Sequence, residues 1–393
     1  MSERTMTLEA PKPPRQLRPR PSAAQSSREI TEWDEKAYLR VISTELTPQQ
    51  RLALTQPSRI YPRQESVLAV HWHPEHIPLD LIRERVNNMF PSRRRELVIP
   101  TQHNIIMAMD GFAGVEVDCY SKGFNRKVQL LLHMREDKVE GADTLKAMLE
   151  HTFKYRSGQL LEFLETLVDP SLEHRLAVPA QETGANEEIV ALARTLAGKL
   201  LAIIYAKEQV TPQVAMKNKL LTDYIDECRA HLDDRLINRV QLFVGAVKKV
   251  VKANFSLSYF YSTEEVIEEA RSLGAGVVVP HPEQFWPILL ADYDLDGYEV
   301  WNPQSNEYTE FLIQVVLRQN KTRKGKQRQL LIFMGDDTHM SEKAKEPRFQ
   351  NPEKAGREIG VQTAWDDHSI SKTLIAANAS RRRVIEEYKN RLS

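Results

Sequence analysis

The sequence predicts an α/β barrel of seven parallel strands with a helical insertion, and three observations support this prediction. Seven short apolar runs have the near-continuous hydrophobicity of strands that are buried on both faces. Helical patterns lie between several of these runs. Most of the runs end in His, Asp or Glu, and polar residues gathered at one end of the strands are typical of a barrel with its site on the carboxyl-terminal rim.

Each expected strand occupies one short apolar run. The seven runs cover residues 67–71, 96–101, 114–118, 128–133, 276–282, 297–302 and 330–339. Apolar residues with the spacing of amphipathic helices lie between them, at 79–89, 263–273 and 308–318. This alternation predicts parallel strand order, because parallel neighbours need a crossover connection that is usually a helix.

Residues 140–260 interrupt the alternation. Apolar residues recur there at three- and four-residue spacing over long stretches, at 145–167, 189–210 and 217–253. We predict a helical insertion between the fourth and fifth strands. Two roles are open for it: covering the rim of the barrel, or packing and homo-oligomerisation.

The remaining boundaries follow from composition. Residues 1–30 are rich in Pro, Arg, Ser and Gln and lack apolar periodicity, so we expect a disordered basic arm. The barrel is then expected over 31–139 and 261–350, and a helical tail over 351–393.

The amino-acid composition gives no sign of a nucleic-acid or membrane partner. Lys and Arg together number 54, as do Asp and Glu, so the net charge indicates neither nucleic acid nor a membrane. The two cysteines, Cys119 and Cys228, form no disulfide framework and favour a reducing compartment. The sequence shows neither a signal-peptide pattern nor an apolar run of the ~20 residues that span a bilayer. We expect a cytoplasmic protein that does not bind membranes.

The first apolar run ends in the pair His71 and His73. Alternate residues of a strand share a face, so both imidazoles are expected to point the same way and to chelate a divalent metal. The pair alone is weak evidence, but the other runs also end in metal-binding side chains. The full set of candidate ligands is His71, His73, His103, Glu116, His133, His281, Asp337 and His339. Imidazoles and carboxylates suit Zn, Mn or Fe.

The order of these motifs resembles the PHP family, the polymerase and histidinol phosphatase superfamily of metal-dependent phosphoesterases. His71-Trp72-His73 matches the family's opening His-x-His, and Gly335-Asp336-Asp337-Thr338-His339 resembles its closing Ser-Asp-x-His. Further similar segments lie at 101–104, 114–116, 133, 280–282 and 297–302. The resemblance covers residues 66–140 and 260–345.

The resemblance implies a distorted (β/α)7 TIM-like barrel that binds two or three divalent ions. The first ion would be held by His71, His73, Glu116 and Asp337. The second would share Glu116 and take His133 and His281. A third would take His103 and His339, together with either His76 or Asp80. The chain departs from the family pattern where Gln102 replaces an acid and Asp336 replaces a small residue.

The activity implied is hydrolysis of a phosphomonoester or phosphodiester by a metal-bound hydroxide, with no covalent nucleophile. The catalytic group would comprise His71, His73, Glu116, Asp337 and His339. Lys343, Lys345 and Arg348 follow the last motif and are candidates for binding the substrate phosphate. The substrate would be a phosphorylated small molecule or a nucleic acid.

Three alternatives are open. The protein could be a nuclease acting on nucleic acid ends or single strands. It could be a non-catalytic, metal-stabilised scaffold that binds a protein partner. An amidohydrolase-like enzyme with a carbon substrate uses similar metal chemistry and ranks lowest.

Overall fold

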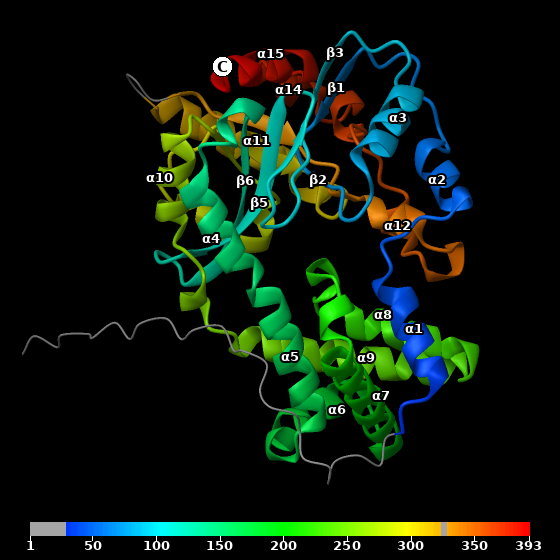
Figure 1. Ribbon diagram of the computed structural model, residues 1–393. Helices are drawn as coiled ribbons and strands as arrows, with labels where there is room; N and C mark the ends of the chain where they lie inside the picture. Colours follow the sequence, from blue (N-terminus) through cyan, green and yellow to red (C-terminus); the bar gives the residue numbers. More distant parts are fainter. Residues whose placement is uncertain (1–28, 324–327) are drawn as a thin grey trace, which may run out of the picture. The chain divides into compact units, whose positions relative to one another are not determined.

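The computed structural model describes residues 29–323 and 328–393, which divide into two compact units (Figure 1). The α/β unit comprises Leu46–Phe153 and Phe260–Ser393. The helical unit comprises Lys154–Tyr259 and the described residues up to Glu45. The sequence placed residues 31–45 with the barrel and started the insertion at 140, so both boundaries differ from those expected.

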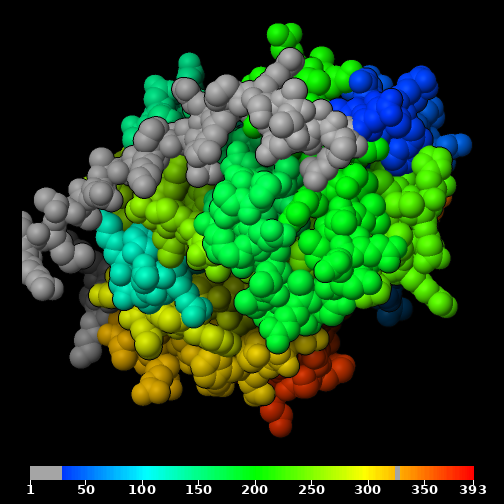
Figure 2. All heavy atoms as spheres, turned by 90° about the horizontal axis from the view of Figure 1, so that it is seen from below, coloured from blue at the N-terminus to red at the C-terminus, as the bar shows by residue number. Residues whose placement is uncertain are grey.

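The helical unit is built on six α-helices in its described residues. They are α1 (Glu32–Ile42), α5 (Tyr155–Val168), α6 (Ala177–Thr183), α7 (Glu187–Ala206), α8 (Lys219–Glu227) and α9 (Asp234–Asn254). Side chains that accept hydrogen bonds from the first turn begin several of these helices: Thr31 begins α1, Asn186 begins α7 and Asp233 begins α9. Their apolar faces form one core, and α1 lies against the green helices of this unit (Figures 1 and 2).

Helix α7 corrects one expectation from the sequence. Its 20 residues are long and apolar enough to cross a membrane by length and composition. Eight of them are buried in the structure, including Leu196, Leu200 and Ile204 in the core of the helical unit. A core helix of a soluble protein passes the same test, so the composition of α7 is weak evidence for a membrane.

The strands of the α/β unit form three separate hydrogen-bonded sheets. Strand β1 (Ser66–Ala69) pairs with β3 (Arg95–Val98), and β2 (Trp72–His73) pairs with β10 (Thr338–His339), both in parallel. The third sheet has the order β4 (Met107–Met109), β5 (Phe112–Ser121), β6 (Arg126–Arg135), β7 (Gly276–Val279), β8 (Gly297–Trp301) and β9 (Leu331–Met334). The fold is therefore mixed α/β, and among the described residues no closed ring of strand pairs makes a barrel.

The expectation of a wholly parallel sheet was wrong. The pairs β4–β5, β5–β6 and β6–β7 are antiparallel, and within this sheet only β7–β8 and β8–β9 are parallel. Only four residues, 122–125, connect β5 to β6, and Asn125 there has a left-handed φ of 51°. So short a connection can join only antiparallel neighbours.

Helices cover these sheets. They are α2 (Pro48–Thr55), α3 (Leu79–Met89), α4 (Asp143–Phe153), α10 (Thr263–Ser272), α11 (Thr309–Thr322), α12 (Met340–Ala344), α13 (Pro352–Ala355), α14 (Ser371–Ala376) and α15 (Arg381–Arg391). The last of them, α15, buries Val384, Ile385 and Tyr388 against Leu68 and Phe333. The C-terminal residues are thus part of the core of the α/β unit.

Candidate metal centre

Seven candidate ligands meet where several strands of the α/β unit end. Three of them follow the carboxyl ends of parallel-paired strands: His71 follows β1, His281 follows β7 and Asp337 follows β9. The parallel pairing of β2 with β10 sets His73 beside His339. A bridge between the loop after β3 and strand β5 sets His103 beside Glu116. Strand ends distant in the sequence therefore supply one cluster.

The cluster contains three overlapping groups, each with three ligand atoms within 4.8 Å of one another. The groups are His71, His73 and Asp337; His71, Glu116 and His281; and His73, His103 and His339. His71 and His73 each belong to two groups. A cluster that shares ligands in this way is suited to ions bound close together.

The distances between the ligand atoms fit a divalent cation. His71 Nε2 lies 3.9 Å from Glu116 Oε1 and 3.8 Å from Asp337 Oδ1. Glu116 Oε1 lies 3.7 Å from His281 Nε2, and Asp337 Oδ1 lies 3.3 Å from His73 Nε2. Tetrahedral ligands at about 2.1 Å from Zn²⁺ would be about 3.4 Å apart. These atoms are thus slightly too far apart for good hydrogen bonds and near the spacing of metal ligands.

Two of the buried imidazoles also have ring nitrogens without a hydrogen-bond partner, which a metal ion could bind. Within the described residues, Nε2 of His71 and both ring nitrogens of His73 have no hydrogen-bond partner. The two side chains are only 1% and 0% exposed, so solvent does not compensate. A buried polar atom without a partner costs about 1–3 kcal/mol. Coordination of a cation removes this cost, and the residues therefore fit a metal ion.

Glu299 on β8 fixes the orientation of His71. Its carboxylate accepts a hydrogen bond from Nδ1 of His71 at 3.0 Å, which leaves Nε2 directed at the cluster. The same carboxylate accepts the backbone N–H of His281 at 2.7 Å. A Cβ on Gly335 would overlap the Glu299 carboxylate, so glycine is needed there. A carboxylate behind a histidine is a common support of metal-binding histidines.

The electrostatic environment keeps His73, Glu116 and Asp337 in the forms that bind cations. For His71, burial alone would lower the pKa, but the carboxylate of Glu299 outweighs this effect and raises the pKa to about 10, so a bound cation would have to displace a proton from this imidazole. Burial lowers the pKa of His73 to about 3, with help from the neighbouring His103 and His339, so its imidazole is neutral. Burial alone would raise the pKa of Glu116, but the adjacent His103 holds it well below the usual value. The pKa of Asp337 is likewise well below its usual value, because His339 and His73 outweigh the effect of burial.

The metal centre also holds strained backbone. His281 and Asp337 have left-handed φ angles of 29° and 44°, and Glu75 has one of 56°. This conformation is energetically unfavourable for residues other than glycine, and it is concentrated at functional sites. The strain is consistent with side chains held in place for ligand binding.

His133 is not part of the cluster, which corrects the ligand set expected for the second ion. Its Nε2 bonds with the carbonyl oxygen of Val70 at 2.8 Å, and its Nδ1 with the hydroxyl of Tyr388 at 2.8 Å. Both ring nitrogens are therefore used in holding β1 and α15 to β6. His71 takes the place of His133 beside Glu116 and His281.

Neither His76 nor Asp80 belongs to any of the three groups. The acid beside the third group is Glu75, whose Oε1 lies 3.7 Å from Nδ1 of His339. Glu75 also accepts a hydrogen bond from the backbone of Ser341, and its own N–H donates to Gln102. The sequence offered a weak signal for it: Glu75 is the first acid after His73.

The three basic residues expected to bind a substrate phosphate have other partners. Lys343 is buried and donates to the carbonyl oxygens of Ala355 and Arg357, so it cannot reach a substrate. Lys345 pairs with Glu342, and Arg348, which is 72% exposed, pairs with Glu346.

A different arginine contacts the metal centre. Arg357 is buried, and its Nη1 donates to Oδ2 of Asp337 at 2.7 Å. Gln304 donates to the same oxygen at 2.8 Å. These donors leave Oδ1 of Asp337 directed at the histidines. Neither residue lies in a sequence motif that would have pointed to this role.

Comparisons with known proteins add little. No protein-family model matches the chain, and no match was found among curated proteins. A search of solved structures finds a protein from Bifidobacterium adolescentis, provisionally named a metal-dependent phosphoesterase, at 15% identity. The match covers 80% of this chain and 96% of that one, with a TM-score of 0.39. Likeness at this level carries no argument, so the functional case rests on the residues of the cluster.

Proposed function

We propose that this protein is a metal-dependent phosphoesterase of the PHP type. The observation that carries the proposal is the set of three overlapping ligand groups that share His71 and His73. Three of the ligands follow β1, β7 and β9, and this placement at the carboxyl ends of parallel-paired strands supports the proposal.

Divalent ions in such a cluster supply Lewis acidity and lower the pKa of water to near neutrality. Other residues of the chain orient the side chains that would bind these ions. Glu299 orients His71, and Arg357 and Gln304 orient Asp337.

The substrate is expected to approach from the side of His103 and His339. Their side chains are 21% and 19% exposed, whereas His71 and His73 are closed off from solvent. In this proposal, His339 would meet the phosphoryl group or its leaving oxygen.

Elemental analysis combined with hydrolysis of mono-aryl and bis-aryl phosphates tests this function. Protein that contains metal is expected to hydrolyse at least one of the two esters, and the preferred ester gives the substrate class. His73→Ala should lose both metal and turnover, while His368→Ala, at an exposed position outside the three groups, should retain both. Metal-loaded protein that is inert towards both esters and towards oligonucleotides would instead favour the scaffold function.

A further inference from the structure

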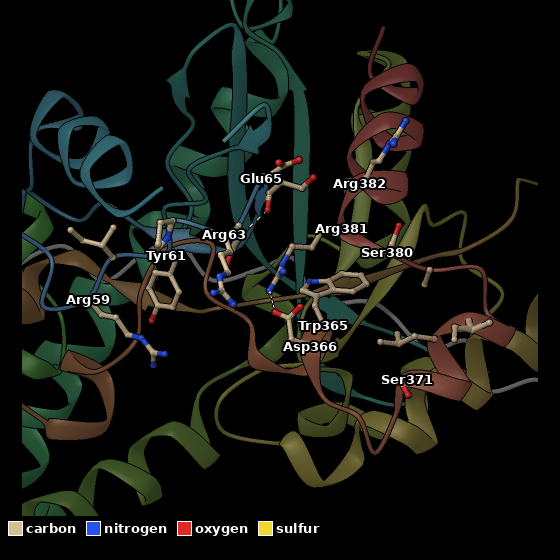
Figure 3. Close-up of a pocket in the computed structure, with 17 residues that line it drawn as sticks. Arg59, Tyr61, Arg63, Glu65, Trp365, Asp366, Ser371, Ser380, Arg381 and Arg382 are labelled. Carbon is tan, nitrogen blue, oxygen red and sulfur yellow. Dashed lines mark hydrogen bonds and ion pairs between the residues drawn. The ribbon is translucent and has the colours of Figure 1, made fainter. Parts of the chain in front are cut away.

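A cavity of about 850 Å³ lies in the α/β unit (Figure 3), and none of the seven clustered ligands lines it. Residues 59–66 line one side of it, and residues from the 365–382 segment line the other. Ser66, at the amino end of β1, is among the lining residues, while His71 follows the carboxyl end of the same strand. At ~3.3 Å per residue the two residues are about 16 Å apart. The cavity is therefore a second site.

Positive charge dominates the lining. Arg59, Arg63, Arg381 and Arg382 line the cavity, against two carboxylates, Glu65 and Asp366. Both carboxylates already have cationic partners: Asp366 pairs with Arg381, and Glu65 lies 3.7 Å from Arg94. The balance of the lining is thus cationic.

Three of the arginines have donors available to a ligand. Arg63 makes no ion pair or side-chain hydrogen bond with any residue that the structure describes. Arg59 contacts Tyr61 through its guanidinium, 5.2 Å from the ring centre, and this contact leaves its N–H groups open. Among the residues that the structure describes, Arg382 donates through Nε alone, to the carboxylate of Glu386. Guanidinium groups with open donors bind phosphate oxygens well, and often through two hydrogen bonds.

The backbone at this place also favours an anion. Helix α15 has 11 residues and begins at the cavity, where Ser380 caps it by accepting the N–H of Arg383. The first N–H groups of a helix have no partner within the helix and carry partial positive charge. The cavity therefore combines arginine side chains with a helix amino terminus.

An apolar edge accompanies the charge. Ile60 and Ile375 line the cavity and are 56% and 77% exposed. Exposed isoleucines beside a cationic pocket suit a ligand with an organic body next to its anionic group. Inorganic phosphate alone would leave this edge unused.

We propose that the cavity binds an organic phosphate of about nucleotide size through Arg59, Arg63 and Arg382. The site is separate from the metal centre and does not depend on the proposed hydrolysis. The shared chemistry is a phosphate group attached to an apolar body, which a soluble metabolite or a phospholipid headgroup could present.

Calorimetric titration of the full-length, metal-loaded protein tests the proposal. The probes are the methylene-bridged analogue of ADP, pyrophosphate, and phosphatidylcholine vesicles with and without phosphatidic acid. We expect saturable binding of the analogue, weaker binding of pyrophosphate, and binding of vesicles only if the headgroup is the source. Arg63→Gln with Arg382→Gln should lower the affinity for the analogue about tenfold per lost arginine, which equals about 1.4 kcal/mol of binding free energy each.

The matched control is Arg51→Gln with Arg383→Gln. Both of these arginines are exposed and do not line the cavity. The control pair should bind the analogue like the parent, and both double variants should retain the parent's melting temperature and aryl phosphate hydrolysis. Equal binding by the cavity pair and the parent would overturn the site. So would tighter binding of a single-stranded oligonucleotide that both pairs weaken equally, since it would indicate a diffuse nucleic-acid surface.

Discussion

Glu299 determines how His71 presents its ring to the metal centre. Its two carboxylate oxygens lie 3.0 and 3.1 Å from Nδ1 of His71. Glu299→Gln keeps the shape of the side chain and removes its charge. Metal affinity is expected to fall by about 10- to 100-fold, the usual cost of losing such a support.

Metal titration followed by calorimetry checks the Glu299→Gln prediction. Glu307→Gln, at an exposed position near the same strand, is the matched control and should bind metal like the parent. If Glu299→Gln binds metal with unchanged affinity, the orientation of His71 does not depend on Glu299.

Gly335 is a second residue on which the metal centre depends. Any side chain there would overlap the Glu299 carboxylate, and His71 lies close behind it. Gly335→Ala is expected to displace Glu299, to weaken metal binding at least as much as Glu299→Gln, and to lower stability.

Gly245→Ala serves as the control for Gly335→Ala. Gly245 lies within α9, and a Cβ there meets no atom within 4 Å. Alanine favours a helix by about 1 kcal/mol over glycine, so this variant should be as stable as the parent or more so. The melting temperature should therefore fall below that of the parent for Gly335→Ala, and stay equal or rise for Gly245→Ala.

At the scale of elements, the sequence predicted strand positions better than strand directions. Each of the seven predicted runs contains a strand, because hydrophobic runs of this kind follow from burial. Direction depends on connection length, and the four-residue link between β5 and β6 was the available signal. The pair β6–β7 is also antiparallel. The long helical insertion between these two strands gave no signal of their direction.

Helix α1 anchors to the rest of its unit through Asp34. This buried carboxylate accepts hydrogen bonds from Lys199 and Tyr224, both at 2.8 Å. Burial alone would raise the pKa of Asp34, but these donors and Thr31 lower it from 3.8 to about 2. A lowered pKa means that the ionised group stabilises the fold fully above pH 3.8 and loses this effect as pH falls through about 2.

Asp34→Asn is therefore expected to destabilise the helical unit by about 2 kcal/mol at neutral pH. The difference from the parent should shrink as pH falls towards 2. Urea unfolding followed by circular dichroism at several pH values measures it. A difference that stays constant with pH would show that the charge of Asp34 contributes nothing.

At the scale of the whole molecule, the two units should respond differently to chelation. All candidate ligands lie in the α/β unit, and the helical unit has its own core. Ions that bind only the native state stabilise it by about 2.7 kcal/mol at a hundredfold excess over Kd. Chelation should therefore increase amide hydrogen exchange in β1, β5 and β9, and leave α7 and α9 unchanged. Equal loss of protection in both units would contradict this localisation.

The cluster as a whole was more predictable than its individual contacts. Ligands at strand ends follow from sequence order, because neighbouring strand ends meet in space. The prediction that His133 is a metal ligand was wrong, although His133 also ends an apolar run, because its ring bonds with Val70 and Tyr388. Arg357 was missed because a buried salt bridge from a distant loop leaves no pattern in the sequence.

Anomalous diffraction from crystals of the metal-loaded protein tests the central claim most directly. We predict peaks within the group of His71, His73 and Asp337 and within the group of His71, Glu116 and His281. Both peaks should disappear in His71→Ala, because that histidine belongs to both groups. Crystals of protein that is active on a phosphoester, but that show no anomalous peak in either group, would contradict the account.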